Sequence, residues 1–248
     1  MIQEHSFHNT SLKQVTYNEF PNVKYINSYA FHDYGHNYNG VYYNGTIEKV
    51  DLPKLISVGS YAFSGQSGQS KMTSFNAPNI NSISDYMFQN CTNLTDLSIG
   101  TLSSISSHGF HGCSKLKNLT SLESLTYMGA YAFAYCSSLS ELSLPNLTTL
   151  GQYVFEYCSS LNKIDTSKIT TINSNVFYNC INLRAVILRN TSRATLSNIN
   201  AFNNTPVASG DGYIYVPKSL VSSYQTASNW SVFSSKFRAI EDYPEICN

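Results

Sequence analysis

The feature that most constrains the fold of this chain is a short unit that recurs in tandem. Residues 133–155 begin and end on Phe, and residues 155–177 repeat the same order of Phe, Cys and Leu or Ile positions 22 residues later. A unit of this size is one supersecondary piece that cannot bury its apolar face alone, so neighbouring units must stack to form a continuous core. The repeat therefore predicts a solenoid.

About eight such units follow one another between residues 1 and 205. Without insertions, each reads Leu-x-x-Leu-x-Leu-x-x-Leu-x-x-Ile-x-x-x-x-Phe-x-x-Cys, with the most regular spacing in the middle of the chain. The Phe residues at the equivalent position, preceded by Phe7, are Phe31, Phe63, Phe88, Phe110, Phe133, Phe155, Phe177 and Phe202. We expect them to lie above one another in a single elongated core.

Within each unit, the alternation in Leu-x-Leu places successive side chains on opposite faces of a short strand. Stacked units would pair these strands in a parallel sheet, which we expect on the concave side of the solenoid. The Tyr-Ala-Phe-x-x-Cys segment is too short for a long helix, so a helical turn or 3₁₀ piece is expected on the convex side. The pattern predicts a strand-dominated α/β solenoid.

Three motifs within this frame resemble those of the BspA-like leucine-rich repeat family of bacterial surface proteins. The motifs are Tyr-Ala-Phe (29–31, 61–63, 131–133), Cys-Ser-Ser-Leu (136–139, 158–161) and Leu-Pro-Asn-Leu (144–147). The resemblance covers residues from about 7 to 205 and implies a leucine-rich-repeat solenoid. It also implies a role in adhesion and in binding host proteins, although members bind diverse partners and a fold does not fix a function.

Residues 206–248 leave the repeat and are expected to form a C-terminal cap of the same domain. Residues 212–216 read as a strand, Pro217 suits the start of a helix, and Leu220, Val221, Tyr224 and Ala227 would form the apolar stripe of that helix. The order of Tyr, Pro and Trp also resembles the C-terminal cap of BspA-like proteins. Because a last coil offers bare apolar surface and an unpaired strand edge, we interpret Trp230 as a lid on the core.

No comparable cap precedes Phe7, so we expect the native protein to extend upstream and to carry an export signal there. The module would then be extracellular or exposed at the cell surface. A formal net charge of +0 offers no basic surface for nucleic acid. The absence of an apolar run of about 18 residues argues against membrane insertion. The expected partner is a protein or glycan on a host or neighbouring cell, bound by a monomeric module without a cofactor.

Five cysteines occupy one position of the repeat, three residues after the Phe: Cys91, Cys113, Cys136, Cys158 and Cys180. A zinc site needs close pairs such as C-x-x-C, and this sequence has none. A catalytic nucleophile needs one distinct Cys beside a His, whereas these five cysteines occupy equivalent positions. Disulfides between neighbouring coils are a further alternative, but stacked copies project their side chains in parallel. We predict a ladder of buried thiols packed as small hydrophobes. Cys247 is left unassigned, and no acid–base or nucleophilic constellation predicts an enzyme.

A second periodic position, two residues before the Phe, holds Tyr29, Tyr61, Tyr86, His108, Tyr131, Tyr153 and Asn175. We interpret it as a packing ladder on the convex side, with a sugar-binding platform as the alternative. Residues 32–46, an insert, supply the candidate ligand-binding residues Tyr34, His36, Tyr38, Tyr42 and Tyr43. This insert could instead be a hairpin that shields the sheet edge, and His32, Asp33 and His36 could hold a metal.

The concave sheet is the other candidate site. Its solvent-facing residues are expected to include Lys49, Asp51, Asp96, Asn118, Glu141, Lys163 and Asp165. Their mixed charges favour no single ligand class. A structural spacer without a ligand remains the alternative function. A binder should present a contiguous patch of exposed aromatics or charge, whereas a spacer should present a uniform surface of Ser, Thr and Asn.

Overall fold

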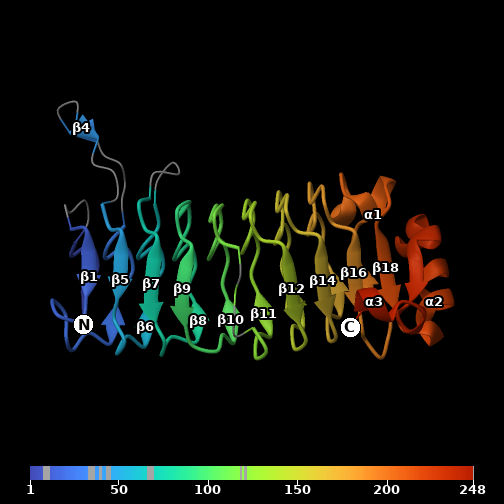
Figure 1. Ribbon diagram of the computed structural model, residues 1–248, viewed down its shortest axis with the longest axis horizontal. Helices are drawn as coiled ribbons and strands as arrows, with labels where there is room; N and C mark the ends of the chain where they lie inside the picture. The colour runs from blue at the N-terminus through green and yellow to red at the C-terminus, as the bar shows by residue number, and fades with distance from the viewer. Residues whose placement is uncertain are drawn as a thin grey trace.

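The computed structural model describes residues 1–7, 12–32, 37–38, 41–42, 46–65, 70–117, 119 and 122–247, with 37–38 and 41–42 described by their backbone. The chain winds into a row of stacked coils that leads from the N-terminal end to a C-terminal end rich in short helices (Figure 1). Within the described part of the chain, no helix is long and apolar enough to cross a membrane.

The longer strands of the coils join two parallel sheets, as the Leu-x-Leu pattern predicted, and between the two sheets the described residues of the fifth coil form no such strand. One sheet contains β1 (Gln14–Thr16), β5 (Lys49–Asp51), β7 (Ser74–Ala77) and β9 (Asp96–Ile99). The second sheet contains β12 (Glu141–Leu144), β14 (Lys163–Thr166), β16 (Ala185–Leu188), β18 (Tyr213–Val216) and β19 (Phe237–Ala239). Equivalent repeat positions are in register, so Leu142 pairs with Ile164 and Ile164 with Val186.

A second column of strands, which the sequence pattern did not predict, follows the first around each coil. Its members are β2 (Tyr25–Ile26), β6 (Ser57–Val58), β8 (Ser82–Ile83), β10 (Ser104–Ile105), β11 (Tyr127–Met128), β13 (Thr149–Leu150), β15 (Thr171–Ile172) and β17 (Thr195–Leu196). Each pairs in parallel with neighbouring coils and buries only its second residue. Strands of two residues are too short to show a period in the sequence.

The third side of the coil consists of turns, where helical or 3₁₀ pieces were expected. Tyr131 and Tyr153 both have φ of 57°, a left-handed conformation that interrupts any right-handed helix. Among the described repeats, only the eighth has a 3₁₀ helix here, η1 (Ile199–Phe202). The turns bond to neighbouring coils: the Phe133 N–H donates to the Val154 carbonyl at 2.9 Å. All three sides therefore contribute to stacking.

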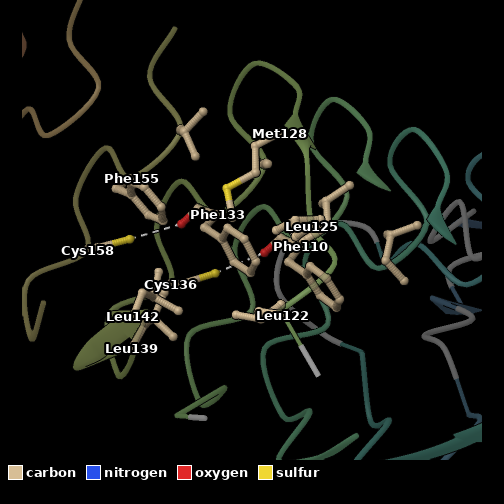
Figure 2. Close-up of a cluster of buried hydrophobic side chains, with 14 of the residues drawn as sticks. Phe110, Leu122, Leu125, Met128, Phe133, Cys136, Leu139, Leu142, Phe155 and Cys158 are labelled. Carbon is tan, nitrogen blue, oxygen red and sulfur yellow. Dashed lines mark hydrogen bonds between the residues drawn. The ribbon is translucent and has the colours of Figure 1, made fainter. Parts of the chain in front are cut away.

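The repeat Phe rings form one column through the core, and this confirms the central prediction from the repeat. Nine rings stack from Phe7 to Phe202, with neighbouring centroids between 5.0 Å for Phe7–Phe31 and 6.3 Å for Phe63–Phe88. Figure 2 shows three of them, Phe110, Phe133 and Phe155, lying in succession. Apolar side chains of the strands surround the column and belong to the same buried cluster.

The predicted ladder of buried thiols is also confirmed. All five repeat cysteines are free and fully buried. Each thiol donates to the carbonyl of the repeat Phe in the preceding coil, as Cys136 does to Phe110 and Cys158 to Phe133, both at 3.1 Å (Figure 2). The Phe133 carbonyl also accepts a hydrogen bond from the Cys136 N–H. The Cys158 thiol therefore donates to the second lone pair of an oxygen that already accepts one hydrogen bond. Cys therefore supplies packing and a weak donor together.

The cap closes the C-terminal end of the core. After α1 (Pro206–Ser209) and β18, the chain forms η2 (Lys218–Leu220), α2 (Val221–Thr226) and η3 (Trp230–Lys236). Trp230 is 1% exposed, and its ring lies 6.0 Å from that of Phe202, which confirms its role as a lid. Its indole N–H donates to the Ala194 carbonyl, and the Ala194 N–H donates to the Tyr224 hydroxyl, both at 2.8 Å. These bonds satisfy the backbone beside the last short strand, β17.

Candidate binding surfaces

The Tyr position two residues before the repeat Phe forms a stacked column, here called the first ring column. Its rings are Tyr29, Tyr61, Tyr86, His108, Tyr131 and Tyr153, with neighbouring centroids 4.3–4.8 Å apart and nearly parallel planes. The left-handed turn places each of these residues at the same corner of its coil. The rings are half-buried, so the column is a packing ladder whose outer edge reaches solvent.

A shorter second ring column lies beside the first and was not singled out from the sequence. It consists of His111, Tyr135, Tyr157 and Tyr178, and the Tyr135 and Tyr157 rings stack at 4.8 Å. The His108 and His111 rings, 5.3 Å apart, join the two columns. Tyr135 is 44% exposed and Tyr157 is 40% exposed, so these rings project further than the first column. We call the two columns together the ring face.

The ring face is rich in hydroxyl donors, and the carboxylates of Asp85 and Glu156 lie near its rings. Burial, followed by the neighbouring Tyr86, raises the pKa of Tyr61 to about 12, and burial also raises the pKa of Tyr131 and Tyr135. Burial, with a smaller contribution from His111, lowers the pKa of His108 to about 4. The phenols of Tyr61, Tyr131 and Tyr135 therefore stay protonated, and the His108 imidazole stays uncharged, at neutral pH.

The outward side chains of the long strands, here called the sheet face, place four of the predicted charged residues in two groups paired in register. Lys49, Ser74 and Asp96 lie side by side in register, and Glu141 lies beside Lys163. The Lys49 ammonium is 3.9 Å from the Asp51 carboxylate, which also accepts from the Asn76 amide at 2.8 Å. Charges of opposite sign alternate with small polar groups, so the open part of this face has no patch of one sign.

Asp165 differs from the other predicted residues because its partner, Arg189, also contacts the C-terminal tail. It forms a bidentate ion pair with Arg189, whose Nη2 also bonds the Cys247 carbonyl. Helix α3 (Pro244–Cys247) lies in front of β16 and β18 in Figure 1, and Cys247 packs on Ala185, Ile187 and Tyr215. The C-terminal tail therefore covers the sheet face at this end.

The remaining predicted residues lie in the insert at residues 32–46 and at position 118, where the structure describes few residues. Tyr34, His36, Tyr43 and Asn118 lie outside the described residues, as does Asp33 of the possible metal site. Tyr38 and Tyr42 belong to β3 (Asn37–Tyr38) and β4 (Val41–Tyr42), an antiparallel pair that forms its own two-stranded sheet. The antiparallel pairing of these four residues is the one that the hairpin alternative predicted, and the shielding of the sheet edge stays a prediction.

The described residues offer little reactive chemistry. No group of three or more His, Cys, Asp or Glu side chains that could hold a metal is found among them. Burial raises the pKa of Cys91 to about 12 and that of the other four repeat thiols as well, which suppresses the thiolate. His32 and Ser64 are hydrogen-bonded to each other and buried, at 8% and 1% exposed.

Comparison with known proteins identifies the repeat. The family model described as "BspA type Leucine rich repeat region (6 copies)" matches residues 1–38, 36–101 and 81–208. A search of curated proteins finds no match. A leucine-rich repeat protein of T. pallidum is 22% identical, with a TM-score of 0.58 over 73% of this chain and 83% of that chain, which supports the fold.

Two further structures are more distant. A leucine-rich repeat protein of Bacteroides ovatus is 14% identical, with a TM-score of 0.43 over 88% of this chain and 76% of that chain. A leucine-rich cell surface protein of Faecalibacterium prausnitzii is 15% identical, with a TM-score of 0.36 over 91% of this chain and 77% of that chain. The family model matches most of the sequence in several overlapping stretches. This chain belongs to the BspA-type leucine-rich repeat family.

Proposed function

We propose that this chain is a non-catalytic binding module of a bacterial cell-surface or secreted protein, and that it adheres to a host protein or glycan through the ring face. The family match and the description of one distant structural neighbour as a cell surface protein support the location. The contiguous aromatic surface supports binding rather than spacing.

The observation that carries the proposal is the exposure of Tyr135 and Tyr157 beside a stacked column of half-buried rings. A spacer needs the stacking but gains nothing from aromatic rings that are 40% and 44% exposed to water. Tyr is favoured at protein interfaces because it combines a large apolar contact with a hydroxyl and has few rotatable bonds. The first ring column holds the neighbouring rings in place, so little conformational entropy would be lost on binding.

Ring orientation favours a protein partner over a sugar. Because the rings of the first column and the Tyr135–Tyr157 pair cover one another's faces, they present edges and hydroxyl groups to solvent. A sugar stacks on the exposed flat side of an aromatic ring, whereas a protein surface can contact ring edges, hydroxyl donors and a long flat stripe. The sheet face, with small polar groups and alternating charges, corresponds to the surface expected of a spacer.

The test measures adhesion of the purified chain to a panel of host extracellular proteins and to a glycan array. The variant Tyr135→Ser/Tyr157→Ser should reduce binding at least about tenfold, because exposed aromatic anchors dominate such interfaces. The matched control Lys49→Ser/Asp51→Ser changes one exposed and one half-buried sheet-face residue and should bind as the wild type does. Loss of binding in the control alone would move the site to the sheet face. Absence of binding by the wild type on both panels would favour the spacer.

A further inference from the structure

The ring face has a one-sided distribution of charge. Most of this face is formed by five consecutive turns, at residues 84–91, 106–113, 129–136, 151–158 and 173–180. None of the 15 Lys and Arg residues of the chain lies in these turns, whereas Asp85 and Glu156 do. A chain without net charge thus places carboxylates and no Lys or Arg in the turns that form this surface.

The backbone of Glu156 is fixed beside the exposed rings. Tyr153 and Tyr157, which flank this residue, both have a left-handed backbone, with φ of 57° and 56°. The Glu156 carbonyl accepts the Tyr135 N–H at 2.7 Å, and the Tyr157 N–H donates to the Tyr178 carbonyl at 2.8 Å. These bonds join successive coils, so the stack itself determines where Glu156 lies relative to the Tyr135–Tyr157 pair.

The Glu156 carboxylate has no opposite charge beside it. The side chain is half-buried, and this burial raises the pKa of its carboxyl group. Burial, and then neighbouring groups that include Glu156, raise the pKa of Tyr131 and Tyr135, so the carboxylate lies near both hydroxyl groups. No described residue forms an ion pair with Glu156. Because a half-buried charge without a partner is unfavourable, a cation from outside would be stabilised here.

The exposed rings complete a site for a guanidinium group. Tyr135 and Tyr157 are 44% and 40% exposed, and the stacked pair presents ring edges and hydroxyl oxygens beside the carboxylate. A guanidinium group is planar and weakly hydrated, and its several N–H donors can bond a carboxylate and a hydroxyl oxygen together. An ammonium group is compact and strongly hydrated, so it would lose more on entering a half-buried position.

We propose that the partner of the ring face is a protein with a basic segment, and that an Arg side chain of this segment pairs with Glu156. The inference rests on the proposed function, because it names the chemistry of the partner that binds there. A basic segment that lies along the five turns meets no Lys or Arg in them. The exposed Asp85, in the first of these turns, offers it a second carboxylate.

The test is an NMR titration of the full chain with a short Arg-rich peptide and with the same peptide carrying citrulline, which is neutral and similar in shape, in place of Arg. The Arg peptide should bind with a Kd on the order of 1 mM and shift the backbone amides of Tyr135, Glu156 and Tyr157. The citrulline peptide should bind at least about tenfold more weakly, because it lacks the charge of the donor. Glu156→Gln should weaken binding of the Arg peptide about tenfold for the same reason.

Glu141→Gln is the matched control, because Glu141 belongs to the same coil but lies on the sheet face. Its Kd should equal that of the wild type. Glu156→Gln should melt no lower than the wild type, since it removes a charge without a partner, and weaker binding then reflects the site rather than unfolding. The proposal is overturned if the Arg peptide shifts none of the three amides, if the citrulline peptide binds as tightly, if Glu156→Gln binds like the wild type, or if Glu141→Gln weakens binding as much.

This proposal and the proposed function can fail separately. If Tyr135→Ser/Tyr157→Ser reduces adhesion to a host protein but the Arg peptide causes no shift, the ring face keeps its function and the Arg site is wrong. If the Arg peptide binds at Glu156 but the Tyr variant leaves adhesion unchanged, the Arg site stands and the role of the ring face in adhesion is wrong.

Discussion

The substitution Phe133→Ala tests how the core column holds the array together. The ring is fully buried, and its centroid lies 5.3 Å from that of Phe110 and 5.9 Å from that of Phe155. Truncation removes the buried ring and leaves a cavity between two neighbouring coils, which lowers the free energy of unfolding by about 3–5 kcal/mol. Phe133→Leu keeps most of the apolar volume and loses only the ring stacking, so it should cost about 1–1.5 kcal/mol.

The assay is urea unfolding followed by far-UV circular dichroism and by tryptophan fluorescence. The fluorescence comes from Trp230, the only Trp, which lies in the cap, whereas dichroism reports on all coils. Because a solenoid is held by contacts between neighbouring coils, a weakened centre should separate the two transitions in the Ala variant. A loss below about 1 kcal/mol with coincident transitions would refute the reasoning, since buried Phe truncations rarely cost so little.

Three further predictions concern the thiols, the imidazoles and the tail. In native protein at pH 8 the five repeat thiols should not react with a thiol reagent, because burial raises the pKa of each. The chromophore released by the reagent measures the reaction, and rapid modification of these thiols would contradict the prediction. As pH falls from about 6.5 to about 4, thermal stability should decrease, because the unfolded chain protonates His108 before the folded chain, whose pKa is about 4, can do so. His108→Tyr should reduce this decrease in a melting series, and an unchanged pH profile would contradict the assignment. Removal of residues 243–248 should expose Ala185, Ile187 and Tyr215 and increase the fluorescence of a hydrophobic dye, while unchanged fluorescence would show that the tail covers nothing.

The repeat made the core predictable because one position recurs in every coil. Phe133 and Phe155 occupy the same place in the unit, and stacking follows from the need to bury that position. The short strands were missed because β13 and its equivalents contain two residues, of which only one is buried. The left-handed turns were missed because Tyr is rarely found at positive φ, and the local sequence does not indicate this conformation.

The candidate surfaces were less predictable because they depend on contacts between distant segments. Asp165 was expected to face solvent, but it pairs with Arg189 and helps to hold a tail that lies far away in sequence. Apolar Ala185 and Ile187 at outward strand positions were an available signal that this end of the sheet is covered. Tyr135 and Tyr157 share the repeat position of Asn90, Gly112 and Asn179, so no regular aromatic pattern drew attention to them.

Amide hydrogen exchange at the repeat Phe positions tests the continuity of the stack most directly. The N–H groups of Phe110, Phe133 and Phe155 each donate at 2.9 Å to a carbonyl of the following coil, at Ala132, Val154 and Val176. No bond within one coil could protect them, so the account predicts that all three exchange only through cooperative unfolding of the coils on either side. Rapid exchange at these amides under native conditions would contradict a continuous stack of coils.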